Sequence, residues 1–222
     1  MSALVIGAGL GGPARVLAKE FGVWINGYEN NAILAEEGMK MSINAGMEKK
    51  APIKFNQLDK ETSFGRVFER ALAKEVLYTI EDKSGLIERI FEQLKDDSLF
   101  LITDYVLKSH ESLLDKDVVE WLRREPLDPF PVTSDTLEKI LEQAGFQIRV
   151  HEDITEHFLE MVNEAWSNAE DSVKLLSQGE EGIQKNLFAI LNEAEIWNRR
   201  TKIMRSGELQ VRRYLAHKPS QF

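Results

Sequence analysis

ALVIGAGLGGPARVLAKEFG, residues 3–22, opens the chain and predicts a strand, a glycine-rich turn and a helix in direct succession. Residues 3–6 form an uninterrupted apolar run, which is typical of a strand buried on both faces of a parallel sheet. Pro13 stands where a helix begins, a position at which the missing N–H is not needed. Apolar residues then recur at helical spacing until Gly22 ends the helix.

The turn in this stretch has the spacing of a nucleotide-binding motif. Gly7, Gly9 and Gly12 fit the pattern G-x-G-x-x-G, in which glycine permits unusual φ angles and a close approach of the backbone to a ligand. The helix that follows points unpaired N–H groups towards negative charge. Glu29 ends the next predicted strand, 23–28, where a carboxylate can accept both hydroxyls of a ribose. A nucleotide-like ligand is therefore expected, and FAD, NAD and S-adenosylmethionine sites can all begin in this way.

The composition narrows the class of protein. A length of 222 residues suits one α/β domain, and a net charge of -9 argues against binding to the backbone of a nucleic acid. The chain has no cysteine, which excludes disulfides, thiolate metal sites and cysteine nucleophiles. Its four histidines lack the spacing of metal ligands, so no metal site is predicted.

The hydropathy pattern predicts a cytoplasmic protein. No apolar run approaches the roughly 20 residues that cross a bilayer, so no membrane association is expected. The N-terminus also lacks a basic region followed by an apolar stretch and a cleavage site.

Strand and helix patterns alternate along most of the chain, which favours parallel pairing with right-handed crossovers. The pattern predicts a doubly wound, mostly parallel, Rossmann-like α/β fold of seven strands with a helical insertion before the last strand. Strands are expected at 3–6, 23–28, 52–58, within 65–73, at 98–107, 146–150 and 208–218. Helices are expected at 13–21, 30–49, 85–95, around 137–144, and at about 156–177 and 183–205. We interpret 1–222 as one domain, divided into a cofactor-binding core (1–155), a helical insertion or lid (156–205) and a last strand with its tail (206–222).

Four blocks of sequence, in order, resemble one enzyme family. They are VIGAGLGGPARVLAKEFG (5–22), AKEVLYTIEDKSGLIERIFEQLKDDSLFLITDYVL (73–107), LEQAGFQIRVHEDIT (141–155) and SGELQVRRYLAHKP (206–219). Together they look like class I S-adenosylmethionine-dependent methyltransferases, particularly the group that includes phosphoethanolamine and sarcosine N-methyltransferases. The resemblance implies a Rossmann-like fold with an antiparallel last strand, S-adenosyl-L-methionine as cofactor, and transfer of its methyl group to a small-molecule acceptor through a nitrogen or oxygen nucleophile.

The resemblance also implies a set of cofactor-binding residues. Those expected to hold the cofactor are Gly7, Ala8 and Gly9 under its methionine part, Gly12 in the same turn, Glu29 and Asn30 at the ribose, Leu58 and Asp59 at the adenine, and Ala73 and Lys74 near the sulfonium. Asp104 and Tyr105 are expected to border the substrate.

Methyl transfer is a direct displacement at a carbon that the cofactor already activates, so the protein mainly aligns the reacting atoms. A general base is optional for an amine that arrives neutral and more useful for a hydroxyl. Tyr105, Glu75 and Tyr78 are the candidate catalytic residues that would orient or deprotonate the acceptor.

Two alternatives stay open. Val5 stands where the family commonly has an acid, Thr79 where the phosphobase enzymes have a histidine, and Ala73 where they have a serine. Only two residues precede the first strand, where most relatives carry a covering helix. The cover is missing, or the predicted helices at 156–205 supply it, or the chain is a truncated or non-catalytic relative. These departures motivate the alternative of a non-catalytic relative with a structural or regulatory role. An FAD- or NAD-dependent oxidoreductase is the other alternative, although such flavoenzymes usually need a second large domain.

Overall fold

The computed structural model describes residues 1–169, 171 and 183–220, and its centre is one sheet of seven strands. The strands follow the order β3-β2-β1-β4-β5-β7-β6. The strands are β1 (Ser2–Ile6), β2 (Trp24–Glu29), β3 (Ile53–Phe55), β4 (Phe68–Lys74), β5 (Leu94–Leu107), β6 (Gln147–Asp153) and β7 (Leu209–Lys218). The pairs among β1 to β5 are parallel, whereas β7 runs antiparallel to both of its neighbours, β5 and β6. The predicted doubly wound fold with an antiparallel last strand is confirmed.

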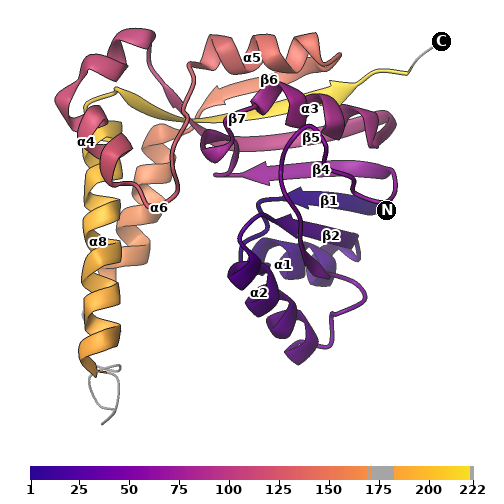
Figure 1. Ribbon diagram of the computed structural model, residues 1–222, viewed down its shortest axis with the longest axis horizontal. Helices are drawn as coiled ribbons and strands as arrows, with labels where there is room; N and C mark the ends of the chain where they lie inside the picture. The colour runs from indigo at the N-terminus through magenta and orange to yellow at the C-terminus, as the bar shows by residue number, and fades with distance from the viewer. Residues whose placement is uncertain (170, 172–182, 221–222) are drawn as a thin grey trace.

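Helices cover both faces of the sheet (Figure 1). They are α1 (Gly12–Phe21), α2 (Ala32–Asn44), α3 (Lys83–Glu92), α4 (Lys116–Arg124), α5 (Ser134–Gln143), α6 (Thr155–Ser167) and α8 (Ile183–Arg205), with 3₁₀ turns η1 (Leu77–Thr79) and η2 (His110–Leu114). In Figure 1, α1 and α2 lie below the sheet and α3 and α5 above it, while α4, α6 and α8 gather at the end towards which β1 and β4 point.

The alternation of side chains along β1 produces two separate cores. Leu4 and Ile6 belong to the larger core, which includes the buried residues of α3 and α5, whereas Ala3 and Val5 pack with α1 and β2. All five residues of β1 are buried, as expected of a central parallel strand. A third cluster contains Tyr78, Tyr105, Trp121 and Phe158 together with residues of α8 and β7.

Several element boundaries differ from the prediction. The strand expected at 52–58 is reduced to Ile53–Phe55, and that expected at 98–107 begins at Leu94. Helix α4, at Lys116–Arg124, had no predicted counterpart. The helix expected at 156–177 is described as Thr155–Ser167; residues 170 and 172–177 of that prediction, and 221–222 of the predicted tail, lie outside the described residues.

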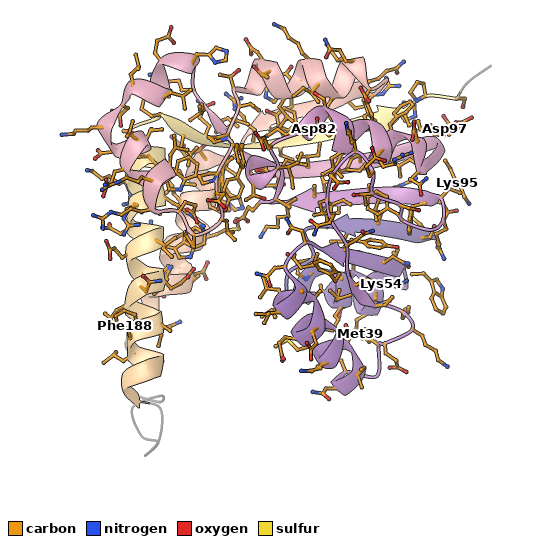
Figure 2. The ribbon with its side chains drawn as sticks, in the orientation of Figure 1. Met39, Lys54, Asp82, Lys95, Asp97 and Phe188 are labelled. Atoms are coloured by element: carbon orange, nitrogen blue, oxygen red, sulfur yellow. The ribbon has the colours of Figure 1, made fainter. Side chains whose placement is uncertain are left out.

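Side chains at the helix ends show why the elements begin where they do. Asp82, labelled in Figure 2, accepts a hydrogen bond from the Gly85 amide at 2.9 Å and so caps α3. At the other end of the molecule, Phe188 lies on the part of α8 that extends away from the sheet, with 75% of its surface exposed.

Candidate functional site

A cleft of about 420 Å³ lies at the edge of the sheet where β1, β2 and β4 end. Its volume falls within the range of roughly 300–1,000 Å³ that is usual for small-molecule sites. It is lined by Gly7, Gly9, Glu29, Asn30, Asn31, Leu34, Glu75, Val76, Thr79, Pro126, Leu127 and Asp128. The carboxyl edge of a parallel sheet is where α/β proteins bind their ligands.

The glycine turn after β1 forms one wall of this cleft. Gly7 has a φ of +65°, and a Cβ there would lie 2.4 Å from Val76 Cγ2, which no side chain could tolerate. Glycine therefore lets this turn pack directly against the loop that follows β4. Gly9 has a φ of +52° and no atom within 4 Å of where its Cβ would lie, so its backbone faces open space in the cleft.

The amides of this turn are used within the protein. The Ala8 amide donates to the Tyr28 carbonyl at 3.0 Å and the Gly11 amide to the Ala8 carbonyl at 2.8 Å. The Gly9 amide donates to Glu29 Oε2 at 2.8 Å. At these three positions the turn therefore offers no free N–H group to a ligand.

Glu29 joins the glycine turn to the start of α2. Its side chain is almost fully buried, with 6% exposed, yet it lines the cleft. Oε2 accepts from Gly9 and Oε1 accepts from the Asn31 amide at 2.9 Å. Each carboxylate oxygen can accept a second hydrogen bond. The geometry is thus compatible with two further donors, as the two hydroxyls of a ribose would provide.

The loop after β4 forms the opposite wall. Glu75 has a φ of +53°, a left-handed conformation that is costly for a non-glycine residue and is often found at functional sites. Its amide donates to the Thr103 carbonyl at 2.8 Å, and its Oε2 accepts from the Tyr105 hydroxyl at 2.6 Å. Tyr105 is buried and reaches the cleft through Glu75, which lines it. Two of the candidate catalytic residues are therefore directly hydrogen-bonded.

Asp104 is buried under this loop, so the expectation that it borders the substrate is wrong. Its carboxylate accepts backbone amides from Val76 at 2.9 Å, Leu77 at 2.7 Å, Tyr78 at 3.2 Å and Tyr105 at 2.8 Å. Burial raises the pKa of the Asp104 carboxyl to about 6, although these four amides act in the opposite direction. Asp104 shapes the loop that carries Glu75 and has no contact with the cleft.

Tyr78 lies behind the cleft in an aromatic cluster. Its ring meets the Tyr105 ring edge-on at 5.0 Å and stacks with Trp121 at 6.2 Å. Burial raises the pKa of the Tyr78 hydroxyl above its ordinary range. Arg200, from α8, places its guanidinium over the Tyr105 ring at 5.9 Å. This cluster connects α4 and α8 to the wall that carries Glu75.

The other predicted site residues are not among those that line the cleft. Ala8, Leu58 and Ala73 are buried in the cores. Asp59 accepts the Glu61 amide at 2.8 Å in a turn, and Lys74 forms an ion pair with Glu75 at 3.0 Å. Gly12 is the first residue of α1. Their contacts with a cofactor stay predictions.

The cleft also includes residues that the sequence did not suggest: Asn31, Leu34, Val76, Pro126, Leu127 and Asp128. Asn31 caps α2 through its Oδ1, which accepts a hydrogen bond from the Ile33 amide at 3.0 Å. An asparagine just before an apolar helix is a sequence signal for such a cap. Asp128 and its neighbours belong to the loop between α4 and α5, which is far in sequence from the glycine turn and from Glu75. The Phe130 amide donates to the Tyr78 carbonyl at 2.6 Å, which ties this loop to the wall behind the cleft.

The strand order and the glycine turn define the class of protein. They form the Rossmann-like fold of S-adenosylmethionine-dependent methyltransferases, and this fold is shared with solved structures. A Haemonchus contortus phosphoethanolamine N-methyltransferase 2 in complex with S-adenosyl-L-methionine superposes with a TM-score of 0.79 at 21% identity, over 99% of this chain and 49% of that one. A Streptomyces coelicolor A3(2) geranyl diphosphate C-methyltransferase gives 0.75 at 14% identity, over 98% and 73%.

Residues 1–151 match the model of the methyltransferase domain family Methyltransf_23, and the chain therefore belongs to that family. Among curated proteins, a Triticum aestivum phosphoethanolamine N-methyltransferase is 23% identical over 169 residues, which cover 75% of this chain and 32% of the relative. The chain thus matches about a third of that relative's length. Family membership implies dependence on S-adenosyl-L-methionine and confirms the resemblance drawn from the sequence.

The part of the chain that the structure describes holds neither a candidate membrane span nor a candidate metal centre. Within it, no helix is both long and apolar enough to traverse a lipid bilayer. The same residues contain no group of three His, Cys, Asp or Glu side chains that could hold a metal ion.

Proposed function

We propose that this chain catalyses methyl transfer from S-adenosyl-L-methionine to a small-molecule acceptor with a nitrogen or oxygen nucleophile. The observation that carries the proposal is that Gly9 and Glu29 from one wall, and Glu75 from the other, line a single cleft at the carboxyl edge of the sheet. Family membership supplies the cofactor class, and the cleft supplies a site of suitable size for it.

On this proposal, Glu29 holds the ribose hydroxyls through the free lone pairs of its two oxygens, with Asn30 beside it. Gly9 allows the cofactor to lie against the backbone of the turn, because no Cβ projects there, and Gly7 lets the turn pack against Val76 of the opposite wall. When bound, the cofactor supplies a methyl group that is already activated by its sulfonium. The protein then needs to align the acceptor in line with that carbon.

Glu75 is the candidate catalytic residue in contact with the acceptor, because it lines the cleft. Tyr105 donates to it and is a candidate positioning residue. Burial and the Glu75 charge both raise the pKa of the Tyr105 phenol well above its ordinary value, so this phenol stays a donor at neutral pH. Tyr78 packs behind Tyr105 and supports the same wall.

Calorimetry with S-adenosylmethionine and S-adenosylhomocysteine tests the proposal directly. We expect both to bind, with S-adenosylhomocysteine released when an acceptor is present. Absence of binding at millimolar ligand would reject the proposal. Binding without turnover on any small acceptor would instead support the non-catalytic alternative, for which the departures at Val5 and Thr79 are the motive.

A further inference from the structure

The ionisable side chains that line the cleft are all acidic. Glu29, Glu75 and Asp128 are among its lining residues, and none of the described residues that line it is a lysine, arginine or histidine. On the proposed function, Glu29 is used by the cofactor. Glu75 and Asp128 then remain as the charged groups that an acceptor meets, one from each of two separate loops.

Glu75 is fixed in place before any ligand arrives. Its Oε2 accepts from Tyr105 at 2.6 Å, its Oε1 pairs with Lys74 at 3.0 Å, and its side chain is 20% exposed. A carboxylate held by a buried phenol cannot rotate freely, so little conformational entropy is lost when a donor binds to it. This is the arrangement that a protein uses to receive an N–H or ammonium group.

The buried arginine nearest this wall is already neutralised. Arg200 donates to Glu125 twice, from Nε to Oε2 at 2.9 Å and from Nη2 to Oε1 at 2.6 Å. Trp121 Nε1 donates to the same Oε2 at 2.7 Å, and the guanidinium also lies over the Trp197 ring at 5.0 Å. The Nε/Nη2 edge and one face of Arg200 are therefore in use, and its charge is balanced by Glu125.

The two lysines of this region are also occupied. Lys83 is buried and donates to the carbonyls of Ile80 and Phe130. Lys74 is paired with Glu75 and is half exposed. A phosphate or carboxylate on the acceptor would therefore enter a cleft that offers carboxylates and has to compete for Lys74.

We propose that the methyl acceptor is an amine without a phosphate or carboxylate group, and that Glu75, with Asp128, selects it. This inference rests on the proposed function and narrows it. It separates this chain from the phosphoethanolamine N-methyltransferases to which it is similar, whose named substrate carries a phosphate.

The chemistry of the step balances with the groups present. The acceptor enters as an ammonium that hydrogen-bonds to Glu75, and it passes one proton through that carboxylate to water. The nitrogen lone pair then forms the N–C bond while the C–S bond of the donor breaks, and the sulfur keeps the electron pair of that bond. The products are the methylated ammonium, S-adenosylhomocysteine and the one proton released to water.

Two matched pairs of acceptors test the proposal with the wild-type chain. Ethanolamine and phosphoethanolamine differ by a phosphate, and butylamine and 4-aminobutanoate differ by a carboxylate in place of a methyl group. We expect the anion-free member of each pair to be methylated with a kcat/KM about tenfold higher or more, the size of one charge-assisted hydrogen bond. Equal rates, or preference for phosphoethanolamine, would overturn the proposal.

Binding measurements separate this proposal from the one on which it rests. Each acceptor is titrated by calorimetry into the chain saturated with S-adenosylhomocysteine. If S-adenosylhomocysteine itself fails to bind, the methyltransferase proposal fails. If it binds, and the anion-free amines bind no better than their anionic partners, only the acceptor proposal fails.

The variant Glu75→Gln keeps the size of the side chain and removes its charge. We expect it to lower the affinity for the amine about tenfold while S-adenosylhomocysteine affinity changes less than about twofold. Asp128→Asn tests the second carboxylate in the same way. Glu88→Gln, at an exposed position of α3 that does not line the cleft, is the matched control and should change neither affinity. An unchanged amine affinity in Glu75→Gln with an intact fold would contradict the assignment.

Discussion

The Glu29 carboxylate and the Gly9 amide are joined by a hydrogen bond of 2.8 Å across the glycine turn. The acid that ends β2 therefore holds the turn that ends β1, in addition to lining the cleft. We predict that Glu29→Ala lowers the affinity for S-adenosylhomocysteine by at least about tenfold and costs about 1–3 kcal/mol of stability, because two backbone amides lose hydrogen bonds to a charged acceptor in partly buried positions. Calorimetry and urea unfolding measure the two effects.

Glu29→Gln provides the finer comparison. One amide oxygen can still accept from Gly9 or from Asn31, but the new NH₂ group then faces the other donor. An intermediate loss of both affinity and stability is expected. If Glu29→Gln bound S-adenosylhomocysteine like the wild type, the ribose assignment would be wrong.

Gly7 and Gly12 predict opposite outcomes for the same substitution. Gly7→Ala would place a Cβ 2.4 Å from Val76 Cγ2 on a backbone with a φ of +65°. We expect a loss of roughly 2–4 kcal/mol of stability and of measurable cofactor binding, because two walls of the cleft are forced apart. Gly12→Ala meets no atom within 4 Å and lies in the first turn of α1, so it should be neutral or slightly stabilising. Thermal melts of the two variants, side by side, decide the matter.

The fold could be predicted from the sequence because its signals are local. The apolar run at 3–6, the glycines after it and Gly22 each specify a backbone conformation through their own residue types. Helix α4 was not predicted, because it is short and follows directly after the 3₁₀ turn at His110–Leu114. Its buried residues are Val118 and Trp121.

The site was predictable only in part, because its walls come from distant segments. Glu29 and the glycine turn share one motif, and the structure places them in one cleft. Asp128 lies in a loop whose position depends on a hydrogen bond from Phe130 to the Tyr78 carbonyl, and no spacing rule encodes that contact. The family resemblance implied that Asp104 borders the substrate, but its carboxylate accepts hydrogen bonds from four backbone amides beneath the loop.

The buried ion pair between Arg200 and Glu125 predicts a large effect for a single substitution. Both residues are more than nine-tenths buried, with 8% and 6% exposed. Removal of one partner leaves a buried charge unpaired, so Glu125→Ala should destabilise the chain by about 3–5 kcal/mol. Chemical unfolding of the purified variant gives this value.

The double variant Glu125→Ala/Arg200→Ala is the control for that prediction. Because it removes both charges, it should be more stable than the sum of the two single variants implies, with a coupling energy of about 1–3 kcal/mol. Additive effects would show that the pair contributes only packing. Arg199→Ala, which loses an ion pair with Glu195 on the exposed side of α8, should change stability by less than about 1 kcal/mol.

Because Lys83 is buried, we predict that the stability of the chain depends on pH above about pH 8. Burial lowers the pKa of its ammonium to about 8, against an ordinary value of 10.5, although the Asp104 charge acts in the opposite direction. Between these two values the unfolded chain binds more protons at this residue than the folded chain does. The contribution of Lys83 to stability therefore rises as the pH increases from 8 to 10.5, by at most about 3 kcal/mol, and is constant below that window.

Burial raises the pKa of Tyr78 and Tyr214 in the folded chain, whereas in the unfolded chain tyrosines ionise near pH 10, at the upper end of the same range. The comparison must therefore be made with a variant. Lys83→Met removes the titrating group and keeps a long apolar stem. We expect the stability of the wild type relative to Lys83→Met to increase from pH 8 to pH 10.5 in urea unfolding measured at matched ionic strength. A difference that stays constant across this range would show that the folded chain does not hold the Lys83 ammonium at a lowered pKa. The same variant removes the hydrogen bond from Lys83 to the Phe130 carbonyl, so we expect the loop that carries Asp128 to be held less firmly.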